Sequence, residues 1–182
     1  MMNKEKHTHT EMPLPQAAPL VLDSEASVAE KALLILESKL GMHEVGGPNM
    51  GPIVDWAVAR FTHTHPDKTG WAQWCAGAVC TAFAEAGSTL ILQVGSLWVP
   101  SLYRNLHKRG LAVRVQKNVI PSSFTPQAGD IVFFGRQTPK HVEIVKAYDR
   151  ATHRIQSVGG NVDDAVRERV SGSFFGFARI GQ

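Results

Sequence analysis

The sequence predicts a single α+β domain, because helical and strand patterns occupy different parts of the 182-residue chain. Up to about residue 110, apolar residues recur every three or four positions, as they do on one face of a helix. Beyond residue 112 the period changes to two, which indicates strands. Sixteen glycines and ten prolines mark many turns and argue against a purely helical bundle. The expected architecture is therefore a set of N-terminal helices packed on a small antiparallel sheet.

Each expected helix has a recognisable start or stop. Ser24 or Ser27 is a suitable N-cap for the first helix, and Pro52 suits the first turn of the second. Glycine follows the first, third and fourth helices and is a common residue after a helix end. The Gly-rich residues 41–51 are expected to form a loop. The expected helices are residues 24–40 (or 27–40), 52–61, 74–86 (or 75–86) and 101–109.

The strands are expected in the second half of the chain. A Pro-Gln-Ala-Gly-Asp turn at residues 126–130 leads into an apolar run, and residues 149–153 form a turn between the two arms of a hairpin. The expected strands are residues 112–115, 131–134, 141–148, 154–158, 166–170 and 174–180.

Residues 1–24 are expected to form a flexible N-terminal arm, and residues 25–182 one folded domain. The arm has no helical or strand period, and Pro13 and Pro15 restrict their neighbours to extended shapes. His7 and His9 are two ligands on one flexible segment, which do not make a metal site. The charged start is not followed by a long apolar stretch, so a signal peptide is not predicted.

Composition excludes several classes of function. No apolar run approaches the roughly 18 residues that a membrane helix needs, so membrane insertion is not expected. Two cysteines cannot form a disulfide scaffold or a four-cysteine zinc site. The net charge of +3 is spread without a block of like charges, so nucleic-acid binding is not expected.

Cys75 stands at the start of the third expected helix and is the candidate nucleophile. The free N–H groups and the dipole of a helix N-terminus stabilise a thiolate and lower the pKa of a thiol. The small residues 76–78 leave room around the sulfur. A buried, inert cysteine is the alternative. We expect Cys80, which lies on a different face of the same helix, to be such a buried, inert cysteine.

His141 opens a predicted strand and is the candidate base. A thiolate that attacks a carbonyl needs an imidazole to hold and deliver the proton, and a third polar group to orient the imidazole. Asn161 follows Gly159 and Gly160 at the end of the next strand, so a hairpin would bring it near His141. We therefore expect Asn161 to take the third role. The competing candidates are His153, Ser157, Asp163 and Asp164.

Five short motifs occur in an order that resembles a known family. They are Glu44-Val-Gly-Gly-Pro-Asn49 in the Gly-rich loop, Trp74-Cys75-Ala76, Pro126-Gln-Ala-Gly-Asp130-Ile-Val-Phe-Phe134, His141-Val-Glu-Ile-Val145 and Val158-Gly-Gly-Asn161. Over about residues 28–170 they resemble the CHAP branch of the NlpC-type papain-like cell-wall hydrolases, in particular its short phage-associated members. The resemblance implies a papain-like fold and hydrolysis of peptidoglycan by an amidase or an endopeptidase.

The resemblance also implies a Cys–His mechanism, with Cys75 as the nucleophile, His141 as the base and Asn161 as the orienting residue. Two positions depart from the family pattern. Many relatives have glycine after the His-Val pair, where this chain has Glu143. Some relatives carry an acid two positions before the Asn, where this chain has Gly159. The acidic calcium-binding loop of some CHAP lysins has no evident counterpart, so neither a metal nor another cofactor is expected.

Further residues are candidates for the site. Papain-like enzymes pair a glutamine side chain with the nucleophile's own N–H as an oxyanion hole, and Gln73 suits that role. Helix capping or simple exposure is its alternative. Five residues are expected to border the substrate cleft: Glu44, Asn49, Trp71, Trp74 and Trp98. Loop structure is the alternative for Glu44 and Asn49, and core packing is the alternative for the three tryptophans.

The expected partner is bacterial peptidoglycan, and the expected state is a monomer. Two alternatives stay open: an acyltransferase or protease on the same fold, and a non-catalytic phage or virion module or wall-binding domain. Without a signal peptide, the protein is expected to be made in the cytoplasm and to reach the cell wall after phage lysis or through a secretion machine. In the second case, an immunity or inhibitor protein is a further expected partner.

Overall fold

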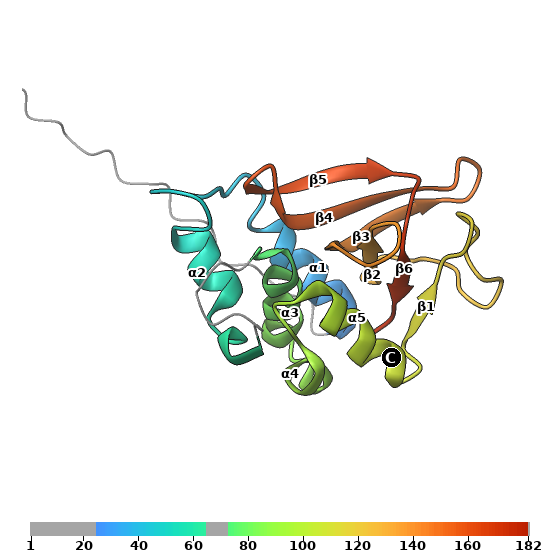
Figure 1. Cartoon of the computed structure of the whole chain (residues 1–182), viewed down its shortest axis with the longest axis horizontal. Helices are drawn as coiled ribbons and strands as arrows, with labels where there is room; N and C mark the ends of the chain where they lie inside the picture. Colours follow the sequence, from blue (N-terminus) through green and yellow to red (C-terminus); the bar gives the residue numbers. More distant parts are fainter. Residues whose placement is uncertain (1–24, 65–72, 182) are drawn as a thin grey trace, which may run out of the picture.

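A computed structural model describes residues 25–64 and 73–181 and has the α+β architecture that the sequence predicts (Figure 1). The expected arm of residues 1–24 lies outside the described residues. The helices are α1 (Val28–Glu37), α2 (Pro52–Val58), α3 (Cys75–Glu85), α4 (Thr89–Val94) and α5 (Val99–Lys108), with a 3-10 turn at Thr62–Thr64. The strands are β1 (Ala112–Arg114), β2 (Ile131–Phe134), β3 (His141–Asp149), β4 (Arg154–Val162), β5 (Ala165–Ser171) and β6 (Gly176–Ala178).

Helix starts follow local capping chemistry. Ser27, not Ser24, caps α1: its hydroxyl accepts the Glu30 N–H at 3.2 Å, and the Glu30 carboxylate accepts the Ser27 N–H at 2.9 Å. This reciprocal pair satisfies two N–H groups that an uncapped helix leaves without partners. Pro52 occupies the first turn of α2, as expected. The sequence analysis missed α4, which has six residues and is too short to show a period, although Ser88 caps it.

All six strands form one antiparallel sheet in the order β1-β6-β2-β3-β4-β5. The central hairpin β3–β4 matches the expected one, but β4 continues to Val162, through the two glycines taken as its end. Side chains from elsewhere fill the space above these glycines. A Cβ on Gly160 would lie 2.5 Å from Cζ3 of Trp74, and one on Gly159 would collide with Glu143.

The core lies on both faces of the sheet. Helix α3 packs against β3 and β4, and α1 packs against α3, so the helices gather on one side (Figure 1). In β3, Val142 and Ile144 join the cluster beneath the helices. Val145, Val132 and Phe134 belong to a second cluster, and Val132 and Phe134 pair across β2–β3 with Glu143 and His141. His141 and Glu143 therefore lie on the same face of β3, and His141, as the first residue of the strand, is also within hydrogen-bond reach of Cys75 at the start of α3.

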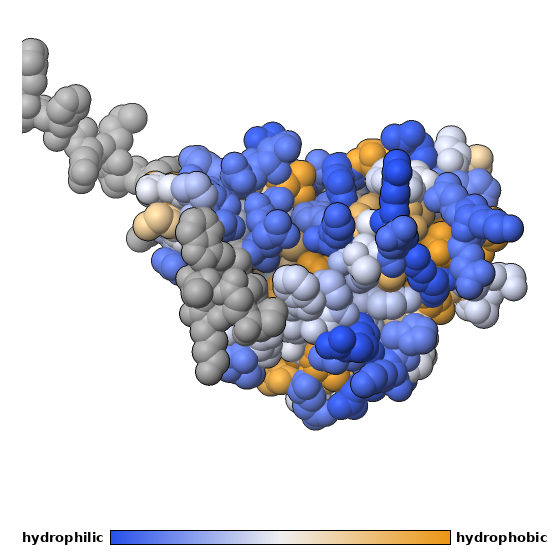
Figure 2. Space-filling model, in the orientation of Figure 1, coloured by the Kyte–Doolittle hydropathy of each residue, from blue (hydrophilic) through white to orange (hydrophobic). Residues whose placement is uncertain are grey.

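The surface is mixed in polarity. Figure 2 shows mostly hydrophilic side chains on one face of the molecule, with smaller apolar areas between them. This distribution is ordinary for a folded domain, because a domain has too few polar groups to cover its surface completely. Among the described residues, no helix combines the length and the apolar character needed to cross a membrane.

Candidate active site

Cys75 is the first residue of α3, as its place in the sequence predicts. Trp74, at the N-cap position, makes no capping hydrogen bond through its side chain. The N–H groups of the first turn are therefore not capped by that residue, and their partial positive charge lies beside the cysteine. The next three positions are alanine, glycine and alanine, all buried. Gly77 allows α2 to approach closely, since a Cβ there would lie 2.5 Å from the Ala57 carbonyl oxygen.

A cleft of about 680 Å³ brings the sequence-predicted residues together. Cys75 of α3 and His141, the first residue of β3, both line it, and so do Asn161 and Gln73. The remaining wall consists of residues 97–100 before and within α5 and residues 138–140 before β3. Trp98 is 45% exposed, so one of the expected aromatic residues does border the cleft. The site lies where the first residue of a helix meets the first residue of a strand.

The His141 ring is held between the nucleophile and a carboxylate. Its Nε2 lies 2.9 Å from Oε1 of Glu143. Burial by itself would lower the pKa of His141. Hydrogen bonding with the Cys75 thiol and with the Glu143 carboxylate, together with the negative charge on both, outweighs burial and raises that pKa to about 9. Because Nε2 is bonded to Glu143, Nδ1 is the ring nitrogen available for proton exchange with sulfur.

Glu143 is the partner of His141 that was not predicted from the sequence. Its side chain is fully buried, yet it is surrounded by polar partners. Oε2 accepts the Ser157 hydroxyl at 2.5 Å, and Oε1 lies 2.5 Å from Nε of Arg169 as well as near the histidine. Gly159 stands opposite Glu143 in the β3–β4 register and leaves the space that this side chain fills. The sequence contains a signal for this residue, because an acid two positions from His141 in a strand lies on the same face of the sheet as His141.

Asn161 reaches the cleft, but Glu143 occupies the position expected for it. Asn161 lies at the irregular end of β4 with a left-handed backbone, φ 57°. The hydrogen bond that holds Nε2 of His141 goes to Glu143. Gly159, not Asn161, lies against the acid, and the β4–β5 register is irregular between Gly159 and Val162, where Asn161 stands. Asn161 lines the cleft, whereas Glu143 is fully buried.

Three expected cleft residues do not line the cleft, which corrects that part of the sequence analysis. Trp74 is fully buried in the core, and its Nε1 donates to Oε1 of Glu44 at 2.7 Å. Oε2 of Glu44 accepts the Asn49 N–H at 2.6 Å. Glu44 therefore connects the Gly-rich loop to Trp74, the residue before Cys75. Trp71 lies outside the described residues. Gln73 is exposed within the cleft, close to Cys75.

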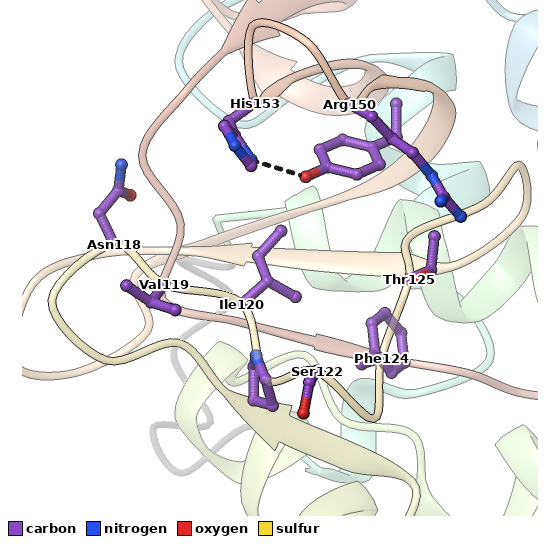
Figure 3. A pocket seen from close by; sticks show the side chains of 10 residues that line it. Asn118, Val119, Ile120, Ser122, Phe124, Thr125, Arg150 and His153 are labelled. Carbon is purple, nitrogen blue, oxygen red and sulfur yellow. Dashed lines mark hydrogen bonds between the residues drawn. The ribbon is translucent and has the colours of Figure 1, made fainter.

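The other candidates for the third role lie elsewhere. Ser157 contacts Glu143, not His141. Asp163 and Asp164 are exposed in the turn between β4 and β5. His153 lies beyond the far end of β3 and its Nδ1 is bonded to the Tyr148 hydroxyl at 2.9 Å, in a second pocket of about 530 Å³ (Figure 3). β3 has nine residues, so its two ends are roughly 26 Å apart.

Cys80 is part of the core, as the sequence analysis expects. It is fully buried, its sulfur lies 3.8 Å from the Ser96 carbonyl oxygen, and burial raises its pKa to about 12. Within residues 25–64 and 73–181, no group of three or more His, Cys, Asp or Glu side chains is arranged to hold a metal ion.

Comparison with protein-family models, with curated proteins and with solved structures finds no match to this chain.

Proposed function

We propose that this protein is a papain-like cysteine hydrolase that cleaves an amide bond of bacterial peptidoglycan, as an amidase or an endopeptidase. One observation carries the proposal: Cys75 at the start of α3, which is only 1% exposed, meets His141 at the start of β3 in the wall of a cleft, and the histidine is bonded to a buried carboxylate. A cysteine-bearing helix packed on an antiparallel sheet that carries the histidine is the arrangement that a papain-like fold requires.

The mechanism follows from the charges at the site. With its pKa near 9, His141 is protonated at neutral pH, and the imidazolium stabilises a thiolate on Cys75. The thiolate attacks the amide carbonyl carbon and forms a C–S bond. The C–N bond then breaks as His141 gives its proton to the leaving amine. Neutral His141 next takes a proton from water, whose oxygen attacks the thioester, and the thiolate leaves as the acid product forms.

The oxyanion that forms in both steps needs donors close to the sulfur. The N–H of Cys75 itself is in the first turn of α3, where α-helical N–H groups have no partner within the helix. The Gln73 side chain is exposed at the same end of the cleft and has two amide N–H donors. We assign these two groups to the oxyanion hole, which in other enzymes contributes about 2.7–4 kcal/mol per donor.

Peptidoglycan is the substrate that best suits this cleft. The motif resemblance points to it, and the cleft wall offers an exposed aromatic ring, Trp98, and a cation, Lys140. Peptidoglycan supplies carboxylates on its stem peptides and apolar sugar faces for these two groups. An acyltransferase would need to exclude water from the thioester, whereas exposed side chains, among them Gln73 and Trp98, border this cleft. A non-catalytic module would not need the buried Glu143 beside the histidine.

Mass analysis of digested peptidoglycan tests the proposal. The full chain is expected to release fragments with new amino and carboxyl ends, whose identity distinguishes an amidase from an endopeptidase. Cys75→Ala should reduce the rate by roughly 10³-fold or more, as the loss of a nucleophile does in other hydrolases. Cys80→Ala is the matched control and should retain most of the activity. A folded full-length chain that releases no fragments, or an active Cys75→Ala variant, would contradict the proposal.

A further inference from the structure

Arg169 of β5 lies next to the buried carboxylate of Glu143. Its Nε is 2.5 Å from Oε1 of Glu143, and its guanidinium carbon lies 3.9 Å from the centre of the Phe134 ring. Nε and Nη2 of Arg169 are buried and have no hydrogen-bond acceptor among the described residues, so the contact with Glu143 is an ion pair and not an aligned hydrogen bond. The cross-strand partner of Arg169 is Ser157, which donates to the other oxygen of Glu143.

We propose that Arg169 is a positioning residue, whose fixed positive charge compensates the buried Glu143 carboxylate during the half of the reaction cycle in which His141 is neutral. This inference rests on the proposed function, because it assigns a partner to the same Cys–His pair. The three groups that hold Glu143 come from three strands: His141 of β3, Ser157 of β4 and Arg169 of β5. Of these, only Arg169 keeps its charge throughout the cycle, because a guanidinium does not lose its proton in a protein.

The need for such a charge follows from burial. Glu143 is fully buried, and an isolated charge in that position is costly. While His141 is an imidazolium, it compensates the carboxylate. Once His141 has passed its proton to the leaving amine, that compensation is gone, and only a second cation can take its place. Without that second cation, the state with neutral His141 rises in free energy, and the step in which His141 acts as a base slows.

The direction of the effect on titration is fixed by charge alone. A nearby positive charge lowers the pKa of a titrating group, so removing Arg169 should make His141 hold its proton to higher pH. The charged and titratable groups that face His141 are the Cys75 sulfur from α3 and Glu143 on its own strand, with Lys140 next to it in the chain. Arg169 acts on it through Glu143.

NMR titration of His141 in the full-length protein tests this without any substrate. Arg169→Met, which keeps the length of the side chain but not its charge, should raise the proton affinity of His141 roughly tenfold. Arg169→Lys should titrate close to the wild type. Arg167→Met removes an exposed charge two residues away on β5 and is the matched control, for which we expect no change. The signal is assigned by its loss in His141→Gln.

A double variant distinguishes a positioning role from a structural one. In a Glu143→Gln background, Arg169→Met should shift the His141 titration by less than about twofold, because the group through which it acts is gone. A wild-type titration in a folded Arg169→Met variant would overturn the proposal, as would an equal shift in the Glu143→Gln background. If Arg169→Met does not fold, the comparison of Arg169→Lys with Arg169→Gln decides in its place. Because no peptidoglycan is used, these outcomes do not depend on whether the protein cleaves it.

Discussion

Single residues of the site differ in how visible they are in the sequence. Cys75 and His141 are recognisable because each opens an element, and the signals for that, helix and strand starts, are local. Glu143 was missed although it is two residues from His141, because its importance depends on groups far along the chain. Gly159 provides its space, and Arg169 provides its counter-charge. No local sequence pattern indicates that β3, β4 and β5 bring these groups together.

The different positions of Glu143 and Asn161 relative to His141 give a prediction for single residues. Glu143→Gln keeps the shape of the side chain but removes the charge bonded to His141, so the pKa of His141 should fall from about 9. We expect kcat at neutral pH to drop by roughly 10- to 1000-fold, which corresponds to about 1.4–4 kcal/mol. Asn161→Ala should have a smaller effect on kcat, because Asn161 lines the cleft but Nε2 of the ring is already bonded.

Steady-state kinetics on purified peptidoglycan fragments, with His141 titration alongside, measure both effects. If Asn161→Ala collapses kcat while Glu143→Gln leaves kcat and the titration unchanged, the orienting role belongs to Asn161, as the motif resemblance implies.

At the scale of elements, the hairpin β3–β4 shows which boundaries a sequence can predict. β2 was predicted at its observed bounds and β3 within one residue, since apolar runs with flanking turn residues mark them clearly. β4 was ended too early because Gly159 and Gly160 look like a turn. In the structure they stay in the strand, and Trp74 and Glu143 fill the space where their side chains would be. Glycine inside a strand often marks such a close approach, but its partner is not visible in the local sequence.

This pairing predicts that the carboxylate can be moved from one strand to the other. Residues 143 and 159 are opposite each other in the register that pairs Ile144 with Val158, so they share one face and one space. Glu143→Gly alone should lose activity, because His141 loses its partner. Gly159→Glu alone should destabilise the protein, because two carboxylates would compete for a buried space. The double variant Glu143→Gly/Gly159→Glu should recover a large part of the kcat lost in Glu143→Gly.

Kinetics and thermal unfolding of all three variants decide the matter, with Gly172→Glu as a control, because a Cβ at that glycine would make only ordinary contacts at 3.8 Å. A double variant that is no more active than Glu143→Gly would show that the strand carrying the acid matters, and not the space it fills.

For the whole molecule, the site couples the stability of the fold to pH. The pKa of His141 is raised from about 6.5 in an unfolded chain to about 9 in the folded protein. A raised pKa means that protonation favours the folded state. The His141 contribution is therefore fully present below about pH 6.5 and is lost as the pH rises through about 9.

The expected result is a melting temperature that declines more steeply between pH 6.5 and pH 9.5 in the wild type than in Glu143→Gln, where the partner that raises the pKa is gone. Differential scanning calorimetry at closely spaced pH values measures this. His107→Gln, a change at an exposed histidine on α5, is the control and should follow the wild type. Parallel curves for the wild type and Glu143→Gln would contradict the prediction.

The shared space of positions 143 and 159 also constrains how such a chain can diverge. Among the four combinations of glycine and glutamate, one leaves no acid and one crowds two acids into the same buried volume. A lineage that moves the acid between strands by single substitutions must pass through one of these, and the glycine–glycine intermediate loses the partner of His141. We therefore expect the two combinations with a single acid to be separated by less active intermediates, and the two positions to be inherited as a pair.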